Sequence, residues 1–350
     1  MKNFFIENHL ISQKSKPFII AEMSANHNNS LSRALSIVES AAKAGAHAIK
    51  LQTYTADTMT LNVNHPDFII NDKKSLWNGR HLYELYKKAH TPWEWHYPLM
   101  EHAKKLGIVC FSTPFDSTAV DFLEELNVPA YKIGSFENTD IQLIRKICST
   151  KKPIIISVGM ASLEELDLIV KTLRSEKCEN FVLLKCTSVY PASPSDANLR
   201  TIPHLSDMFN CQVGLSDHTM GIGVPLAAIA MGATVVEKHF CLSRAEGGVD
   251  SSFSMEPSEL KLLVEESEKS WLALGKVSYE RSCSEEGSKQ FKRSLYFVKN
   301  MKVGEKITED CIKSIRPGGG LEPKYYKKIL LKNLKRSVRY GDPVKLEFLI

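Results

Sequence analysis

The chain alternates short apolar runs with amphipathic segments, and this alternation limits the folds open to it. Eight apolar runs, each suited to a buried strand, are separated by segments whose apolar spacing suits helices packed on one face. Strand-helix alternation implies a parallel sheet with right-handed crossovers, and eight repeats over roughly 250 residues favour a closed barrel over an open sheet. We therefore predict an α/β fold, a TIM (β/α)8 barrel. The GxGxxG turn of a dinucleotide-binding domain is absent after the first run.

Polar and ionisable residues gather at the ends of these runs. Because the active site of a closed parallel barrel is assembled from the carboxyl ends of its strands, we expect these residues to meet in one site. The set is Glu22, Lys50, Gln52, Thr113, Lys132, Ser135, Glu137, Ser157, Tyr190, Ser216, His218 and His239. Alternate residues of a strand share a face. This rule places Lys50 with Gln52, Ser216 with His218, and Glu237 with His239.

Two lysines near strand ends, Lys50 and Lys132, have no acidic neighbour in the sequence. A buried lysine is costly unless an anion compensates its charge. Together with strand-end hydroxyls they predict a cradle for a phosphate and a carboxylate. The hydroxyls belong to Thr113, Ser135, Ser157 and Ser216. A lysine in a barrel can alternatively form a Schiff base with a carbonyl substrate, as in class I aldolases, and this alternative stays open.

Two histidines, His218 and His239, end the seventh and eighth strands, which are neighbours in a closed barrel. Two imidazoles together with water and substrate oxygens suit a divalent transition ion such as Mn²⁺. Candidate acid/base groups are Glu22, at the end of the first strand, and Asp250, in a Gly-rich loop after the eighth.

Residues 54–92 form an unusually long connection after the second strand. Loops that follow barrel strands usually span about 2–6 residues and lie at the catalytic end, so we expect this insertion to cover the mouth of the barrel. Its aromatic residues are candidates for shaping a sugar-sized pocket, with simple packing onto the barrel as the alternative. They are Trp77, Tyr83, Tyr86, Trp93 and Trp95.

The composition of the chain changes near its C-terminal end. Residues 1–278 are predicted to form the catalytic barrel. Residues 279–292 are polar, charged and rich in turn formers, which predicts a linker. Residues 293–350 contain short strands and tight turns and are predicted to form a small separate domain.

Charge and hydropathy exclude several classes of protein. The net charge is +5 with basic residues scattered along helices, so we expect no nucleic-acid partner, whereas an anionic small substrate is compatible. No apolar run reaches the ~18 residues of a membrane span, and the N-terminal segment lacks the apolar core of a signal peptide. We expect a cytoplasmic protein with no membrane partner. The eight cysteines show no CxxC spacing and are predicted to be reduced core residues.

The strand-end motifs, taken in order, resemble those of the sialic acid synthase family, phosphoenolpyruvate-dependent synthases of nine-carbon acidic sugars. The matching segments are AEMSANHN, IKLQTYT, FSTPFD, YKIGSFE, ISVGM, CTSVYP, GLSDHT, VEKHF and SIRPGGG. They span nearly the whole chain, and the C-terminal part is similar to the family's antifreeze-like (SAF) domain. Within the family, SANHN, TYTADTMTL and LWNGRHLYELYKKAHTPWEWH are similar to the pseudaminic acid synthase branch.

The resemblance implies a metal-dependent condensation of phosphoenolpyruvate with the open-chain aldehyde of an N-acylated aminosugar and water, with C–O cleavage and release of phosphate. The implied acceptor is 2,4-diacetamido-2,4,6-trideoxy-β-L-altropyranose, and the implied ion is Mn²⁺, with Mg²⁺ or Co²⁺ as alternatives. An N-acetylneuraminate or legionaminic acid synthase is the alternative within the family. A non-catalytic sugar-phosphate-binding protein is a further alternative, which the density of ionisable groups at one barrel end disfavours.

The resemblance also implies roles for individual residues. Phosphoenolpyruvate would be held by Lys50, Thr113, Lys132, Ser135, Ser157 and Ser216. The sugar would lie near Gln52, Glu137, Tyr190 and Asp250. His218 and His239 would bind the metal, Glu22 would act in acid/base chemistry, and Arg316 would reach the partner's active site in a domain-swapped homodimer. Ser188 stands where the neuraminate branch has Asn, so its contact with phosphate is left open.

Overall fold

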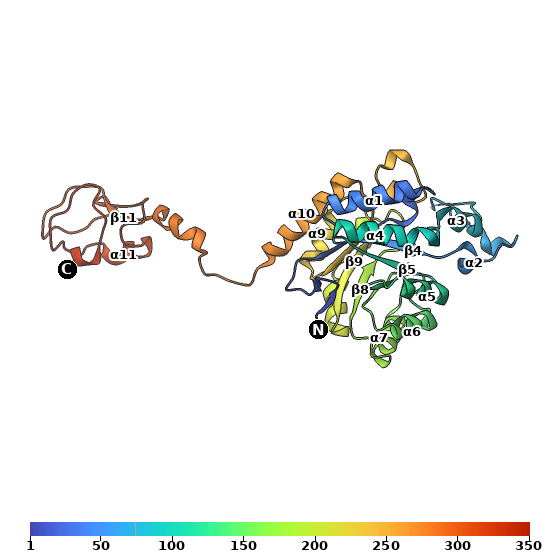
Figure 1. Ribbon diagram of the computed structural model, residues 1–350. Coiled ribbons are helices and arrows are strands. Elements are labelled where there is room, and N and C mark those ends of the chain that lie inside the picture. Colours follow the sequence, from blue (N-terminus) through green and yellow to red (C-terminus); the bar gives the residue numbers. More distant parts are fainter. Residues whose placement is uncertain (74) are drawn as a thin grey trace. The chain divides into compact units, whose positions relative to one another are not determined.

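The computed structural model describes residues 1–73 and 75–350, and it divides into two compact units, Met1–Gly275 and Lys276–Ile350. Figure 1 shows both units, which are described separately below. Among the described residues, no helix is both long and apolar enough to cross a membrane.

In the described part of the first unit, eight parallel strands close into a barrel, and their order around it follows the chain. The strands are β3 (Phe18–Glu22), β4 (Ala48–Thr53), β5 (Val109–Pro114), β6 (Tyr131–Ile133), β7 (Ile154–Ser157), β8 (Phe181–Cys186), β9 (Gln212–Asp217) and β10 (Val235–His239). The last strand, β10, pairs with β3 and closes the ring. These strands are the eight apolar runs of the sequence, so the predicted TIM barrel is confirmed.

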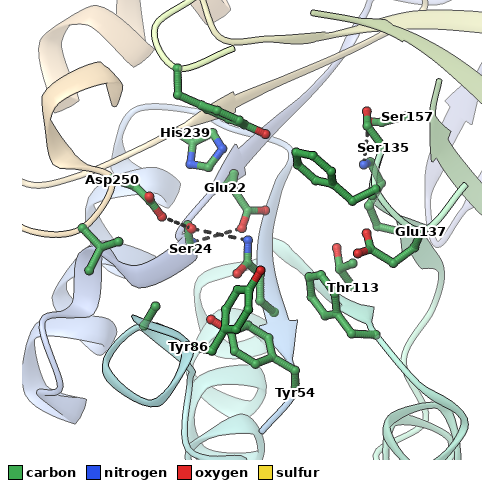
Figure 2. Close-up of a pocket in the computed structure, with 18 of the residues that line it drawn as sticks. Glu22, Ser24, Tyr54, Tyr86, Thr113, Ser135, Glu137, Ser157, His239 and Asp250 are labelled. Carbon is green, nitrogen blue, oxygen red and sulfur yellow. Dashed lines mark hydrogen bonds between the residues drawn. The ribbon is translucent and has the colours of Figure 1, made fainter. Parts of the chain in front are cut away.

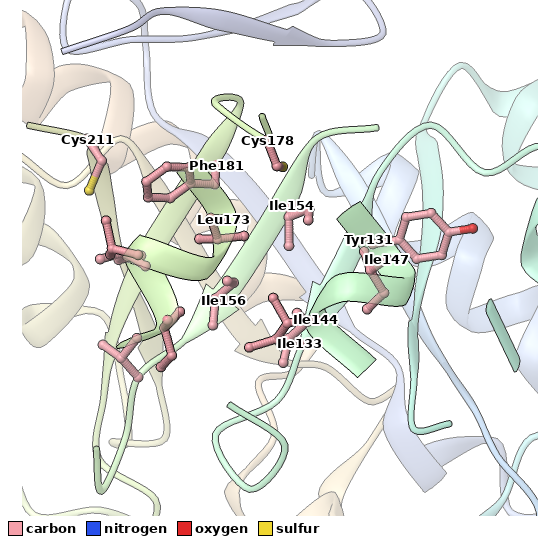
Figure 3. Packing of buried hydrophobic residues seen from close by; sticks show 14 of the residues in the cluster. Tyr131, Ile133, Ile144, Ile147, Ile154, Ile156, Leu173, Cys178, Phe181 and Cys211 are labelled. Atoms are coloured by element: carbon pink, nitrogen blue, oxygen red, sulfur yellow. The ribbon is translucent and has the colours of Figure 1, made fainter. Parts of the chain in front are cut away.

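Helices cover the outside of the barrel (Figure 1). They are α1 (Leu31–Lys43), α4 (His96–Leu106), α5 (Ser117–Glu125), α6 (Ile141–Ser149), α7 (Leu163–Ser175), α8 (Thr201–Phe209), α9 (Gly223–Ala230) and α10 (Pro257–Leu274). Several begin at a polar residue whose side chain accepts a backbone N–H of the first turn, as Asp140 does for α6 and Ser162 for α7. Figure 3 shows one packed layer, in which Ile144, Leu173 and Ile156 of β7 belong to a single buried cluster.

The inward-facing side chains divide the barrel interior into two levels. Near the amino ends of the strands they are apolar and form one buried cluster that includes Ala48, Phe111 and Ile155. Two residues further along the same strands, the inward positions are Lys50, Thr113 and Ser157, which line a cavity. Because alternate residues share a face, each strand supplies both core and site from one side.

An N-terminal hairpin was not predicted from the sequence. It consists of β1 (Phe4–Ile6) paired antiparallel with β2 (His9–Ile11). Phe4, Ile6 and Ile11 join the apolar cluster inside the barrel. Strands of three residues leave too short a pattern to recognise in the sequence, and their burial comes from the barrel that they cover.

The insertion after β4 contains more helix than the sequence indicated. It includes α2 (Ala56–Met59), η2 (Pro66–Phe68) and α3 (Leu82–Ala89), and η3 (Trp93–Trp95) follows it; Lys74 lies outside the described residues. Other short 3-10 helices lie in the loops of the first unit. These are η1 (Ser24–His27), η4 (Pro194–Asp196), η5 (Arg244–Glu246) and η6 (Ser251–Phe253).

The second unit has its own small core around the antiparallel strands β11 (Ser294–Phe297) and β12 (Ile312–Ile315). Its other elements are η7 (Cys283–Phe291), η8 (Pro323–Tyr325), α11 (Tyr326–Ile329) and η9 (Leu346–Phe348). Residues 279–292, the predicted linker, are exposed throughout and contain η7. Cys283 is exposed, unlike the other cysteines, which are buried.

Three buried histidines of the first unit predict a pH-dependent stability. Burial lowers the imidazole pKa of His27, His47 and His96 to about 4. The unfolded chain takes up these protons near the ordinary value of 6.5, so the stability is fully present above pH 6.5 and is lost as the pH falls toward 4.

We expect His96→Gln to reduce this dependence, because a glutamine can bond to Thr53, whose Oγ1 lies 2.7 Å from His96 Nε2, without titrating. Between pH 7 and pH 5 the free energy of unfolding of the wild-type protein should fall by about 2 kcal/mol relative to the variant. Denaturant unfolding of both proteins at the two pH values measures the difference. A difference that stays constant would contradict the burial argument.

Candidate active site

The carboxyl ends of the barrel strands surround a cavity of about 280 Å³, part of which is shown in Figure 2. The residues that the sequence singled out and that line it are Glu22, Lys50, Gln52, Thr113, Lys132, Ser135, Glu137, Ser157, Tyr190, Ser216, His218, His239 and Asp250. Residues that are up to about 230 positions apart in the sequence therefore meet in one cavity, as the position of polar residues at strand ends predicted. The role of each residue stays a prediction.

Two predicted residues lie elsewhere. Ser188 follows β8 beside the cavity, with its Oγ 3.7 Å from the Sγ of Cys186, a cavity residue. Arg316 belongs to the second unit, where it is exposed directly after β12.

The two lysines of the cavity are paired with carboxylates from other strands. Glu22 of β3 forms an ion pair with Lys50 of β4, its register neighbour. Glu237 of β10 reaches both lysines, with its Oε1 3.9 Å from Lys50 Nζ and 3.7 Å from Lys132 Nζ. The carboxylates that are absent near the lysines in the sequence therefore reach them across the barrel and compensate their charge.

Glu237 is the main functional candidate that the sequence reasoning missed. The alternation rule had already placed it on the same face as His239, and that was the available signal. It is 6% exposed, and its Oε2 has no hydrogen-bond partner among the described residues. A buried carboxylate between two lysines can receive a further donor from a ligand.

The surroundings of the two carboxylates push their pKa values apart. Burial raises the pKa of Glu22 to about 7, although the neighbouring Lys50 opposes this. Burial acts on Glu237 in the same sense, but Lys132 and Lys50 outweigh it and hold its pKa below the ordinary value. When two neighbouring titratable groups have pKa values that differ in this way, the difference indicates which group exchanges a proton and which stays ionised. Glu22 is thus the group that can exchange a proton near neutral pH, while Glu237 stays ionised.

The lysines also respond to this arrangement. Burial lowers the pKa of Lys132. For Lys50, burial is outweighed by Glu22 and Glu237, so its pKa is raised and it stays charged. Both donate to hydroxyls, Lys50 Nζ to Thr113 Oγ1 at 2.9 Å and Lys132 Nζ to Ser157 Oγ at 2.7 Å. Charged donors beside hydroxyls suit a phosphate or carboxylate.

The two histidines form a pair that fits a metal ion. The Nδ1 of His218 lies 2.8 Å from the carbonyl oxygen of Thr187, so it donates there and leaves Nε2 with a free lone pair. The Nδ1 of His239 is buried without a hydrogen-bond partner, and the two ring centroids are 5.5 Å apart. Burial lowers the pKa of His239 well below its ordinary value, which favours the neutral form that metals bind.

Within residues 1–73 and 75–350, no group of three or more His, Cys, Asp or Glu side chains is arranged as a metal site. An ion held by His218 and His239 would therefore take its remaining ligands from water and substrate. Such an open coordination sphere is typical of catalytic rather than structural ions.

A polar chain connects the candidate acid/base groups on one side of the cavity (Figure 2). The hydroxyl of Ser24 donates to Asp250, and Gln52 Nε2 donates to Ser24 Oγ at 3.3 Å. The backbone N–H of Ser24 donates to Glu22 Oε1 at 3.1 Å. Ser24 was not predicted as a site residue, although it lies in the SANHN motif.

The insertion contributes mostly apolar side chains to the lining of the cavity. They include Met59, Ile70, Trp77, Leu82, Leu85 and Tyr86. Of the five predicted aromatic residues, Trp77 and Tyr86 therefore line the cavity. Trp93 instead stacks on Phe122 and Trp95 packs edge-on against His27. Tyr83 donates to Asp57 at 3.0 Å. The aliphatic residues were missed because nothing in the sequence distinguishes them from ordinary packing residues.

A parallel barrel with this many ionisable groups at one end defines an enzyme. Residues 37–279 match the NeuB family and residues 292–350 match the SAF domain. The chain is 46% identical to the pseudaminic acid synthase of Campylobacter jejuni over 94% of this chain and 96% of that protein. It is 43% identical to the pseudaminic acid synthase of Helicobacter pylori over 95% and 97% of the two chains.

Among solved structures, the chain resembles an N-acetylneuraminic acid synthetase from Leptospira borgpetersenii, crystallised with citrate. The TM-score is 0.73 at 33% identity, covering 82% of this chain and 95% of that one. The chain belongs to the NeuB family. The predicted membership of the sialic acid synthase family, and the predicted SAF domain, are confirmed.

The packing around Gly159 predicts a selective defect in the anion cradle. A Cβ at this position would lie 2.3 Å from Ser188 Oγ and 2.7 Å from Ser135 Oγ, so Gly159→Ala must displace both hydroxyls. We expect inorganic phosphate to bind at least about tenfold more weakly, as one or more charge-assisted bonds are lost. Titration calorimetry measures this.

Gly223→Ala is the matched control, because a Cβ there meets no atom within 4 Å. Unchanged phosphate affinity in a folded Gly159→Ala protein would show that these hydroxyls do not contribute to the cradle.

Proposed function

We propose that the chain is a pseudaminic acid synthase. It condenses phosphoenolpyruvate with the open-chain aldehyde of 2,4-diacetamido-2,4,6-trideoxy-β-L-altropyranose and water to give pseudaminic acid and phosphate. The observation that carries this proposal is the arrangement of one cavity: two lysine–hydroxyl pairs lie beside two imidazoles that fit a metal ion and beside an acid with a pKa near 7. The 46% identity to a named pseudaminic acid synthase supports the same branch.

Phosphoenolpyruvate would lie over the lysines, which together with four hydroxyls offer donors to its phosphate and carboxylate. The hydroxyls are those of Thr113, Ser135, Ser157 and Ser216, and Ser188 is close enough to Ser135 to add a further contact. Glu237 would keep both lysines ionised before the substrate arrives. The carboxylate pairing of Lys50 disfavours a Schiff base at that lysine, because a charged amine is not nucleophilic.

The reaction forms a bond between C3 of phosphoenolpyruvate and the aldehyde carbon of the sugar. A divalent ion, Mn²⁺ with Mg²⁺ or Co²⁺ as alternatives, would be held by His218 and His239 and would polarise the aldehyde oxygen as a Lewis acid. Water would then add to C2, and Glu22 would take its proton and return a proton to the alkoxide formed from the aldehyde oxygen. Collapse at C2 breaks the C–O bond to phosphate, and the lysines stabilise the departing anion.

The cavity offers both polar and apolar side chains to the proposed sugar. Gln52, Glu137, Tyr190 and Asp250 offer polar groups to hydroxyls and N-acyl groups. Among the lining residues of the insertion, Ile70, Leu82 and Leu85 have no polar group to replace the hydration of a hydroxyl. A methyl group at C6 is favoured there, whereas a hydroxyl buried without a partner is costly.

Acceptor preference tests the proposal most directly. Phosphate release from phosphoenolpyruvate should proceed with a higher kcat/KM for the 2,4-diacetamido-2,4,6-trideoxy-altrose than for N-acetylmannosamine, by about tenfold or more, because an apolar lining discriminates by about 1–3 kcal/mol per group. The legionaminate precursor belongs in the same panel. A higher kcat/KM for either competitor would assign the chain to the corresponding branch instead.

Metal dependence gives a second test. We expect chelation to abolish phosphate release and Mn²⁺ to restore it. His218→Ala and His239→Ala should each reduce kcat by about 10² or more, because the developing charge loses its stabiliser. Steady-state assays with chelated and metal-reconstituted protein measure both effects. Full activity of the chelated wild-type protein would remove the metal from the mechanism.

We also propose a domain-swapped homodimer in which the second unit of one chain covers the active site of the other. The second unit carries more basic than acidic residues and the first unit more acidic than basic residues, so the two are electrostatically complementary. Exposed apolar residues follow four consecutive barrel strands at the active-site end, namely Phe136, Met160, Val189 and Met220. Exposed apolar side chains after four neighbouring strands favour a covering partner. Arg316 would complete the partner's site.

Mixed dimers test the role of Arg316. Lys50→Ala and Arg316→Ala homodimers should each be nearly inactive. A mixed dimer carrying one of each would contain one doubly defective site and one intact site, so mixing under subunit exchange should recover up to about half of the wild-type activity per mixed dimer. Exchange is verified by mass and activity by phosphate release. Complete exchange without recovery would place Arg316 in its own chain's site or outside the chemistry.

A further inference from the structure

A buried ion pair joins the outer faces of β9 and β10 next to the two histidines. Lys238 Nζ lies 2.7 Å from Asp217 Oδ2, and the two side chains are 1% and 2% exposed. The two residues are also direct register partners in the barrel. Their side chains point away from the barrel interior, because they alternate with His239 and Ser216, which line the cavity.

The pair is part of a closed set of hydrogen bonds that holds the loop after β9. Lys238 Nζ also donates to the carbonyl oxygens of Thr219 at 2.5 Å and Gly221 at 3.2 Å. Asp217 accepts from the backbone N–H of Thr219 at 3.1 Å and from its hydroxyl at 3.0 Å. The three N–H groups of one ammonium are therefore used on one carboxylate and two carbonyls.

The ion pair lies where the pairing between β9 and β10 ends, directly before the two histidines. The register between β9 and β10 ends at Asp217 and Lys238, so the pair is the last tie of that ladder before the histidines. In the sequence, His218 lies between Asp217 and Thr219, and His239 follows Lys238 directly. Movement of either strand end would change the separation of the two imidazoles.

Stability is a weak explanation for such a pair. Replacing a buried ion pair by apolar residues of similar volume is often neutral or stabilising. Hydrogen bonds that orient metal-binding histidines, by contrast, are worth roughly 10- to 100-fold in metal affinity. A pair that leaves no donor of its ammonium unused, placed between two candidate ligands, is better explained by geometry than by stability.

We propose that Lys238 and Asp217 are positioning residues that set the separation and orientation of His218 and His239 for a divalent ion. This inference rests on the metal site of the proposed function. His218 is additionally held through Thr187, which follows β8. Between β9 and β10, Lys238 and Asp217 form a side-chain ion pair, and Ser216 Oγ and Glu237 Oε1 form a longer contact of 3.5 Å on the inner face.

The test uses a double variant, because Lys238→Met alone would leave a buried carboxylate without its cation and strongly destabilise the fold. Asp217→Asn with Lys238→Met removes both charges and keeps the side-chain volumes. Mn²⁺ binding to the full-length, metal-free protein is measured by electron paramagnetic resonance of free Mn²⁺. We expect the dissociation constant to rise about 10- to 100-fold. The Mn²⁺ concentration for half-maximal activity should rise in parallel, with kcat largely recovered at saturating Mn²⁺.

Lys152→Met is the matched control. Lys152 lies before β7, at the opposite end of the barrel, and pairs with Glu124 at 2.7 Å. The Lys152→Met variant should change the melting temperature of the protein without changing its affinity for Mn²⁺. If the folded double variant binds Mn²⁺ with wild-type affinity, the positioning role of the pair is overturned, whereas the proposed metal site is not. Wild-type protein that binds no Mn²⁺ would overturn the metal site and this inference together, and an unfolded double variant would show that the pair serves stability instead.

Discussion

The site depends on four ionisable groups that share one buried region of the barrel. Lys50, Lys132, Glu22 and Glu237 come from four strands, each is at most 6% exposed, and they compensate one another before any ligand binds. Burial makes each charge costly alone, so the four side chains must stay in mutual contact. The separation of the pKa values of Glu22 and Glu237 follows from this contact, because the lysines hold Glu237 ionised while burial dominates at Glu22.

The packed core of the barrel supports these charged side chains from below. On the inward face of β3, β4, β5 and β7, an apolar residue is followed two positions later by a polar one, so the packed core supports the site directly. The N-terminal hairpin extends the apolar level with Phe4, Ile6 and Ile11. Above it, the insertion adds mostly apolar lining residues, which lie on a different element from the charged groups. Recognition of the acceptor can therefore vary without disturbing the chemistry.

Recognition of the family and arrangement of the site came from different kinds of information. The eight strands, most covering helices and the membership of the sialic acid synthase family followed from periodicity and from motifs at strand ends. The insertion was located correctly, but only Trp77 and Tyr86 of its aromatic residues line the cavity. Packing partners such as Phe122 for Trp93 are distant in sequence and leave no local signal.

By itself the sequence determined which side chains would meet, because alternation along a strand and parallel order in a barrel bring inward-facing strand ends to one place. Only the tertiary structure decided how those side chains pair. Glu237 reaches two lysines on β4 and β6 from β10, and Lys238 ties β10 to Asp217 of β9, through contacts across the barrel. The charge state of a buried group depends on such neighbours and on its distance from water. Neither can be inferred from the residues that adjoin the group in the sequence.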